Sequence, residues 1–286
     1  IVSQAPAIIS AANTVFPAQN DNFVFGPMAK IIWGPDNAEI LNVELGLIIQ
    51  TNPVALAVIG LLRCTLPNKH APLIDLRMVF AGGIDTSKKL IWFDAQLIES
   101  RIIGYTATGS MRLRIAYGDK PDFVLSVGGF HPSYNPPARL ELGVVDRMAI
   151  RMFESDNVQL RAESYFALTS NTVQFGGAVW LKAKFWKLNV NGDLTYNVLF
   201  QFNPFHADVH LNLSIKVWKL HFYAVVNAVL EGPNPWKLTG NISIETPWPF
   251  PDIDVDFEVE WGDENKEIAP SVAVYPLLET ALGAPH

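Results

Sequence analysis

Hydrophobic and polar residues alternate with a period of two along most of this chain. The clearest stretch is DIDVDFEVEWGDE (252–264), in which a carboxylate occupies every second position from Asp252 to Glu260. Successive side chains of a β-strand point to opposite faces of the sheet, whereas a helix would scatter both sets of residues. The stretch is therefore predicted to be a strand with an acidic face in water and an apolar face on a core.

The same alternation recurs between turns rich in Gly, Pro, Asn and Asp, and it predicts about sixteen strands. The clearest segments are FVFGPMAKIIWG, ILNVELGLII, LIDLRMVFAGG, KLIWFDAQL, MRLRIAYGDKPD, FVLSVGG, RMAIRMFES, VQLRAESYFALTS, VQFGGAVWLKAKFW, KLNVNGDLTYNVLFQF, ADVHLNLSIKVW, LHFYAVVNAVL, WKLTGNISIE and the acidic strand. Most connections are too short for a crossover helix, which favours antiparallel pairing of consecutive strands. Only Ala5–Val15 and Tyr275–Leu282 have a helical pattern.

These observations predict an all-β fold, an extended antiparallel meander with minor helix at the ends. Strands with one apolar face must bury that face, so the sheet is expected to be rolled or curved into a sandwich, a gutter or an open barrel. The apolar side would then form a filled core, line a groove for acyl chains, or face lipid. The glycine pairs Gly82-Gly83, Gly128-Gly129 and Gly176-Gly177 are interpreted as bulges or bends of a curved sheet.

The loop GGFHPSYNPPARLELG, which carries three prolines, is predicted to separate two lobes. The expected organisation is a lead segment at 1–22, a first β lobe at 23–130, the proline-rich loop at 131–145, a second β lobe at 146–262 and a C-terminal segment at 263–286. The start, IVSQAPAIIS, has no initiator Met and no clear signal pattern. We therefore expect the sequence to be part of a longer chain.

Composition narrows the classes of partner. The 286 residues carry a net charge of -7, and the 21 Lys and Arg form no basic run, so nucleic acid is not an expected partner. Cys64 is the only cysteine and excludes an internal disulfide, which leaves the bacterial cytoplasm and export without disulfides both open. The longest apolar run, Val54–Leu62, is about half of the roughly 20 residues that a transmembrane helix needs.

Two groups of residues are candidate metal ligands. His206, Asp208 and His210 fall on one side of a predicted strand, and His-x-His on a strand can present two imidazoles to zinc. Asp254 and Asp256 belong to the acidic face and could bind a divalent cation. The leading interpretation of both groups is nevertheless a solvated strand face, and in the second group Lys182 and Lys184 of a neighbouring strand could supply countercharges.

The sequence identifies no catalytic residue and no site for an organic cofactor. It contains no G-x-S-x-G elbow, no Walker loop and no G-x-G-x-x-G. A pair of carboxylates such as Asp94 and Glu99 could serve a glycan-acting enzyme, but no feature of the sequence selects this pair over the members of the acidic strand.

Several motifs occur in one order: FVLSVGGFHPSYNPP, YFALTSNTVQFGG, FQFNPF, LEGPNPW and DIDVDFEVEWG. Together they resemble an uncharacterised family of large β-rich domains of unknown function found in bacteria and fungi, over roughly residues 23–262. The resemblance implies a place within a very long protein. It supplies no catalytic residues.

The expected function is a non-enzymatic β-sheet scaffold or binding module of a larger protein assembly. The first alternative is a lipid-binding or lipid-transfer protein with an apolar β-groove. The second is a carboxylate-dependent glycan-acting enzyme. A protein or lipid partner is expected in the first two cases.

Overall fold

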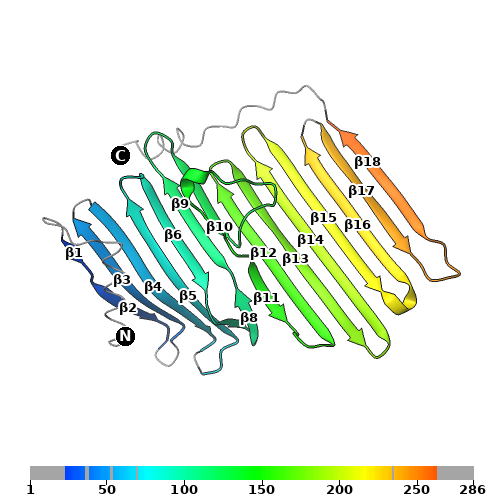
Figure 1. Ribbon diagram of the computed structural model, residues 1–286, viewed down its shortest axis with the longest axis horizontal. Coiled ribbons are helices and arrows are strands. Elements are labelled where there is room, and N and C mark those ends of the chain that lie inside the picture. Colours follow the sequence, from blue (N-terminus) through cyan, green and yellow to red (C-terminus); the bar gives the residue numbers. More distant parts are fainter. Residues whose placement is uncertain (1–22, 36–38, 52–53, 69, 234, 263–286) are drawn as a thin grey trace. The chain divides into compact units, whose positions relative to one another are not determined.

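The computed structural model describes residues 23–262, apart from 36–38, 52–53, 69 and 234 (Figure 1). The predicted helices Ala5–Val15 and Tyr275–Leu282 lie outside the described residues, as do the lead segment 1–22 and the C-terminal segment 263–286. The described chain is all-β and antiparallel, as predicted, with eighteen strands and two short 3₁₀ helices. No helix in the described part of the chain is long and apolar enough to cross a membrane.

The chain divides into two compact units. Of the described residues, unit 1 contains those of 23–129 and 134–152, and unit 2 contains those of 130–133 and 153–262. β11 (Met148–Met152), which falls in the range expected for the second lobe, pairs with β8 (Tyr105–Thr108) and belongs to unit 1.

Unit 1 is built on a series of paired antiparallel strands. Its other strands are β1 (Val24–Phe25), β2 (Met28–Trp33), β3 (Leu41–Thr51), β4 (Val54–Leu66), β5 (Ile74–Asp85), β6 (Leu90–Leu97), β7 (Ser100–Ile102), β9 (Ser110–Ala116) and β10 (Asp122–Val127), with the 3₁₀ helix η2 at Ala138–Leu140. β5 pairs with β6 along Met78–Asp85 and with β7 at its first two residues. The sheet therefore branches at β5, with β7, β8 and β11 on one branch and β6, β9 and β10 on the other.

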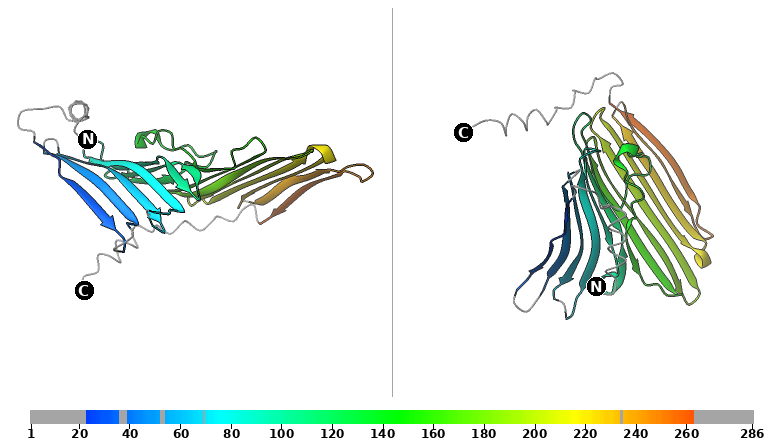
Figure 2. Two further views of the ribbon diagram at one scale, coloured as in Figure 1. Left: turned by 90° about the horizontal axis from the view of Figure 1, so that it is seen from below. Right: turned by 60° about the vertical axis from the view of Figure 1, so that its left-hand side comes forward.

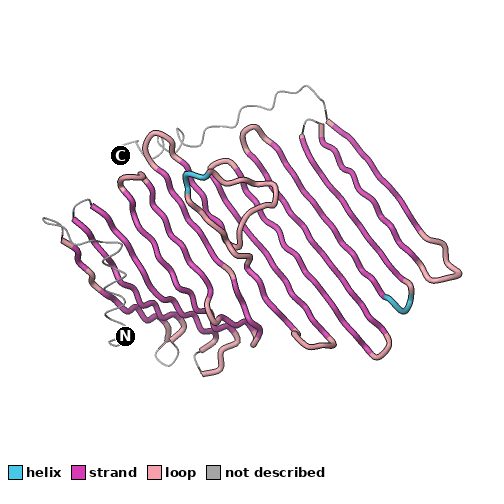
Figure 3. The backbone as a smooth tube through the Cα atoms, in the orientation of Figure 1, coloured by secondary structure: helices cyan, strands magenta, loops and turns pink. Residues whose placement is uncertain are grey.

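Unit 2 is a regular meander in which each strand pairs with the next (Figure 1). Its strands are β12 (Val158–Thr169), β13 (Thr172–Phe185), β14 (Leu188–Gln201), β15 (His206–Val217), β16 (Phe222–Gly232), β17 (Trp236–Glu245) and β18 (Ile253–Trp261). Short loops make the connections, and η3 (Trp218–Leu220) lies between β15 and β16 (Figure 3). The strands of unit 2 form a single layer (Figure 2).

The register of unit 2 sorts its side chains into two faces, because residues paired across antiparallel strands lie on the same side of a sheet. The first, called the apolar face below, carries only aliphatic, aromatic and small side chains, apart from the hydroxyls of Ser164 and Tyr196. It comprises alternate residues of each strand, from Val158, Val173, Leu188, Ala207, Phe222, Trp236 and Ile253 onward. The opposite, polar face carries almost all of the ionisable residues. Strict alternation was thus predicted correctly for this unit.

The acidic strand differs from its prediction in the environment of its apolar side. Asp254 and Val255 point to opposite faces of β18, as expected, since they pair with Ser243 and Ile242. However, only Phe257 of the nine residues is half-buried, and Val255 is 47% exposed. The expected core on the apolar side of this strand is therefore wrong for the described residues, because unit 2 is one layer thick.

Of the two interpretations of the glycine pairs, bulges or bends, the register excludes bulges at two of them. Gly82-Gly83 and Gly176-Gly177 keep an uninterrupted register with both neighbouring strands. At Gly82 an added Cβ would lie 2.8 Å from Phe93, and at Gly176 it would lie 2.5 Å from Tyr165, the residues directly opposite. These glycines make room for an aromatic ring that folds across the strand. Gly128-Gly129, with φ of 77° and 99°, is a bend as expected.

Candidate functional site

Three possible metal ligands of unit 2 gather on its polar face, where β15 and β16 pair. Asp208 and His210 are two residues apart on β15 and therefore point to the same side, and Glu231 of β16 pairs directly with Asp208. One ligand atom from each of the three side chains lies within 4.8 Å of the other two. The three residues are called the Asp208 cluster below.

Within this cluster, Asp208 and His210 are in direct contact. His210 Nε2 lies 2.6 Å from Asp208 Oδ1, and the side chain of Asp208 is only 13% exposed. His210 is more open, with 36% of its side chain exposed, and Glu231 is exposed. The cluster thus has a largely buried carboxylate at its base and an imidazole and a second carboxylate at its open side.

A second histidine, His131, approaches Asp208 from the segment 130–133, which belongs to unit 2. Its side chain is 1% exposed, and its Nε2 lies 3.9 Å from Asp208 Oδ2. The backbone N–H of Ser133 donates to His131 Nδ1 at 3.2 Å. Because Nδ1 accepts this bond, the neutral ring must carry its proton on Nε2, the atom that faces Asp208.

The segment that carries His131 is fixed by a chain of buried hydrogen bonds. The backbone N–H of His131 donates to Gln174 Oε1 at 2.9 Å, and Gln174 Nε2 donates to Thr172 Oγ1 at 2.7 Å. Thr172 in turn shares a 2.8 Å hydrogen bond with Thr169. Gln174 is fully buried and lies in the same cross-strand row as Asp208. A buried amide with both ends bonded holds its partners in one position, so the place of His131 is well determined.

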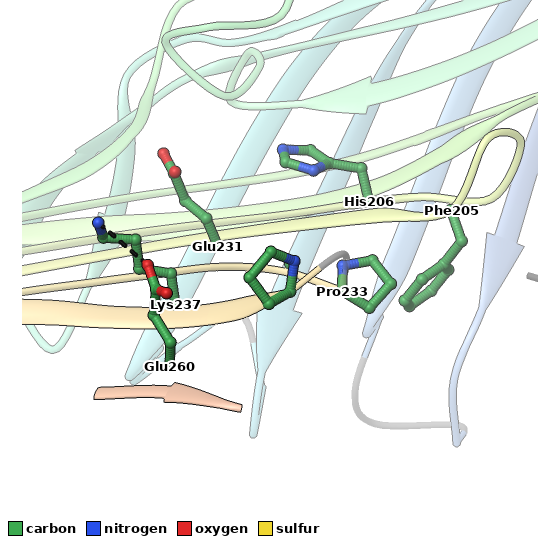
Figure 4. A pocket seen from close by; sticks show the side chains of 8 residues that line it. Phe205, His206, Glu231, Pro233, Lys237 and Glu260 are labelled. Carbon is green, nitrogen blue, oxygen red and sulfur yellow. Dashed lines mark ion pairs between the residues drawn. The ribbon is translucent and has the colours of Figure 1, made fainter. Parts of the chain in front are cut away.

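One member of the cluster, Glu231, also lines a hollow of about 340 Å³, which Figure 4 shows. The other residues that line the hollow are Phe205, His206, Gly232, Pro233, Pro235, Lys237 and Glu260. His206 thus lies at the hollow and not in the Asp208 cluster, although it is on the same side of β15 as Asp208 and His210.

Lys237 supplies the countercharge to the acidic strand. Its Nζ lies 2.6 Å from Glu258 and 3.3 Å from Glu260, and these hydrogen bonds raise the pKa of Lys237, with the Glu258 bond as the larger cause. Lys182, in contrast, pairs with Gln159 of β12 and Asn191 of β14, so it cannot answer the carboxylates of β18. The expectation that Lys182 and Lys184 neutralise the acidic strand is therefore wrong.

The other predicted ligands are not brought to the Asp208 cluster. Asp254 and Asp256 are exposed on the polar face of β18 and pair with Ser243 and Asn241. β18 is three strands away from β15, which corresponds to about 14 Å at the usual strand spacing.

Sequence reasoning found Asp208 and His210, but it missed Glu231 and His131. Glu231 ends an alternating run just before the GPNP turn, so its pairing with Asp208 depended on the exact register of the hairpin.

The carboxylates considered for glycan chemistry are both ion-paired within unit 1. Asp94 lies 2.5 Å from Arg114 and 3.6 Å from Arg112, and Glu99 lies 2.9 Å from Arg77. A catalytic carboxylate must be free to contact its substrate, whereas these two carboxylates are engaged by guanidinium groups of the chain itself. The described contacts of Asp94 and Glu99 therefore suit structural ion pairs better than acid catalysis.

A family model matches nearly the whole chain. The model of a family described as "Family of unknown function (DUF6603)" matches residues 1–283. Neither the curated proteins nor the solved structures contain a match to this chain.

Proposed function

Because the chain belongs to this family of unknown function, we propose from its structure that unit 2 is a non-enzymatic binding module of a larger protein assembly, with the apolar face as its binding surface. The observation that carries this proposal is the continuity of that face. Every described strand of unit 2 contributes to it, and no charged side chain interrupts it.

The size of the face supports a role in binding. Seven strands spaced about 4.8 Å apart, each with nine or more residues rising about 3.4 Å, give a surface of roughly 900 Å². Contiguous apolar patches on monomers rarely exceed a few hundred Å², and larger ones mark interaction sites. The same area is close to the roughly 800 Å² that each partner contributes to a standard protein interface.

The shape and chemistry of the face favour a second apolar sheet as its partner. The strands form one layer, and β-branched and aromatic side chains alternate with small ones such as Gly177, Ala228 and Gly240. Two such faces interdigitate at about 10 Å in β-sandwiches and exclude water from both. Side chains on this face remain open, since Leu211 is 38% and Val259 51% exposed.

The test compares single charges placed on the two faces. Leu211→Lys puts an ammonium group at an exposed position of the apolar face, and Asn212→Lys puts the same group at the next residue, on the polar face. The chain is titrated with an apolar fluorescent dye, and its mass is measured by light scattering. We expect Leu211→Lys to reduce dye binding or self-association several-fold and Asn212→Lys to leave both unchanged. A folded wild-type monomer that binds no dye would contradict the proposal, because the face would then already be covered.

The absence of charge on this face also favours lipid as a second candidate. Acyl chains need a continuous apolar path with no ionised group along it, and the apolar face offers one across all seven strands. Native mass spectrometry of the purified chain separates the two functions. Stoichiometric lipid that is lost in Leu211→Lys would favour lipid binding, and a lipid-free chain that associates through this face would favour the sheet partner.

A further inference from the structure

We propose that Asp208, His210 and Glu231 form a binding site for a zinc-class divalent metal ion, with His131 as a positioning residue behind Asp208. The site lies on the polar face and is independent of the proposed apolar binding surface. It gives unit 2 a metal-binding activity. The metal would join the start of β15 to the end of β16, at the open end of their hairpin.

The donor set fits a transition metal better than calcium or magnesium. An imidazole nitrogen with two carboxylate oxygens is a ligand combination that zinc accepts, whereas calcium and magnesium prefer oxygen ligands alone. Ligand atoms in a tetrahedral zinc site are about 3.3 Å apart, as follows from bond lengths of about 2.0 Å. The corresponding atoms of the Asp208 cluster lie within 4.8 Å of one another, so side-chain movements of at most about 1.5 Å bring them to this spacing.

The backbone holds these donors in place before any metal binds. Asp208 and Glu231 are a register pair, and His210 follows Asp208 on the same face of β15. Both strands are paired on their other sides as well, with β14 and β17. The loss of conformational entropy that brings the ligands together therefore occurs when the sheet folds and not when the metal binds. This favours binding to the folded chain.

Charge also favours a cation here. Asp208 and Glu231 place two carboxylates side by side, and the base of the site is largely buried, which strengthens their repulsion. Lys237 pairs with Glu231 in the register, but its ammonium group is directed to Glu258 and Glu260 on the next strand. A divalent ion between Asp208, His210 and Glu231 would offset the repulsion directly.

His131 is suited to position Asp208 and not to ligate the metal. Its Nδ1 accepts the Ser133 N–H, so its Nε2 carries the proton and cannot offer a lone pair without a change of tautomer. That N–H faces Asp208 Oδ2 at 3.9 Å, while Oδ1 faces His210. Residues that orient a ligating carboxylate through a hydrogen bond typically change metal affinity 10- to 100-fold when they are replaced. At 3.9 Å the His131–Asp208 contact is longer than a hydrogen bond, so we expect a smaller effect from His131.

The open side of the cluster provides an entry route and a free coordination position. His210 and Glu231 are accessible, and Glu231 also lines the hollow (Figure 4). Three protein ligands with an open fourth position leave room for water or for a small donor ligand.

The test uses the whole chain after treatment with a chelator, titrated with Zn²⁺ by calorimetry and with Co²⁺ by absorbance. We expect one equivalent of metal to bind the wild type and to raise its melting temperature, because a ligand of the folded state stabilises it. His210→Ala should lose at least about 10-fold in affinity. His206→Ala is the matched control, since it removes the same side chain from the same side of β15 but outside the cluster, and it should bind as the wild type does.

Two further variants separate ligation from folding and from positioning. Glu231→Gln changes an exposed residue, so it should fold normally, and its loss of affinity would report lost ligation. His131→Gln should weaken binding but keep the shape of the Co²⁺ spectrum, because the ligands themselves are unchanged. A folded wild type that binds neither metal stoichiometrically would overturn the proposal, and so would a His210→Ala chain with unchanged affinity. In that case Asp208 and His210 form only an ion pair.

Discussion

The ring of Phe257 lies against Gly240, the residue directly opposite it on the neighbouring strand. A Cβ built on Gly240 would be 2.4 Å from Phe257 Cζ and 2.2 Å from the carbonyl oxygen of Asn227. Phe257 is also the only half-buried residue of β18. The ring and the bare backbone therefore form the principal packing contact that the described structure provides for the last strand.

This relationship predicts that Gly240→Ala destabilises unit 2. The new methyl group has to displace both the Phe257 ring and the β16 backbone, and overpacking of this kind costs about 1–3 kcal/mol. The measurement is the free energy of unfolding in urea. Gly192→Ala is the control, because its Cβ would meet its nearest neighbours, Leu181 and Ser214, at 3.8 and 3.9 Å. It should be neutral or slightly stabilising, since alanine restricts the unfolded chain. Equal effects of the two substitutions would contradict the packing argument.

Alternation made the strands of unit 2 predictable, because each has one polar side and one apolar side. It worked less well in unit 1. β4 (Val54–Leu66) reads as a nearly continuous apolar run, VALAVIGLLRCTL, and so carries no period of two. β7 and β8 have three and four residues, too few for a pattern to show. Their pairing is decided by the branch at β5, a long-range feature that the local sequence does not encode.

Only the part of the candidate site that lies on one strand was predictable from the sequence. His-x-Asp-x-His placed Asp208 and His210 on one side of β15, but the same reasoning could not exclude His206, which lies outside the cluster. Glu231 joins through the register of the β15–β16 hairpin, and His131 joins from a segment about 77 positions earlier in the chain. Contacts of both kinds depend on the tertiary structure, so they cannot be read from the local pattern of a single sequence.

Arg114 is predicted to stabilise unit 1 in a way that lysine cannot replace. It is 5% exposed, and each of its guanidinium nitrogens has a partner: Nε donates to Leu140 O at 2.9 Å, and both terminal nitrogens bond to Asp94. A lysine ammonium cannot reproduce this planar arrangement. We expect Arg114→Lys to lower the free energy of unfolding by about 1–3 kcal/mol, because buried acceptors lose their hydrogen-bond donors.

Arg112→Lys provides the comparison for Arg114. Arg112 is also on β9 and faces the same carboxylate, but its Nε lies 3.6 Å from Asp94 and it is more exposed. Its replacement should cost less than about 1 kcal/mol, the usual range for a partly solvated pair. If the two lysine variants had similar urea midpoints, the guanidinium geometry of Arg114 would not be the cause of its contribution.

Asp75 is predicted to make unit 1 sensitive to acid. Arg63 and Arg77 are directly opposite one another on β4 and β5, and Asp75 contacts both, with two 3.0 Å hydrogen bonds from Arg63. These bonds are the main reason that the pKa of Asp75 lies below its ordinary value, against the opposing effect of partial burial. The contribution of Asp75 to stability is therefore complete above the unfolded-state pKa of about 3.9 and disappears as the pH falls through the lower folded-state pKa.

Unfolding free energies of the wild type and Asp75→Asn, measured from neutral pH down to the acid limit, test this dependence. The difference between them should be at most about 1 kcal/mol near neutral pH, because Arg63 is 44% exposed. It should shrink below about pH 4 and vanish at still lower pH. Arg63→Gln should remove the same acid-dependent part. A difference that stayed constant into strong acid would show that Asp75 acts through packing and not through its charge.

Asn227 and Asn241 are predicted to couple β16 to β17 on the polar face. They form a register pair, and Asn227 Nδ2 donates to Asn241 Oδ1 at 2.8 Å. Asn212 and Asp256 extend the same cross-strand row on either side, so the pair lies within a row of polar side chains.

Each single alanine substitution of Asn227 or Asn241 should lower the free energy of unfolding by about 0.5–1.5 kcal/mol, the usual net value of such a hydrogen bond. Because both substitutions remove one shared bond, the double variant should cost less than the sum of the two, with a coupling of at least about 0.5 kcal/mol. Urea unfolding of the four chains gives this coupling directly, and strictly additive effects would mean that the two amides stabilise the sheet independently of each other.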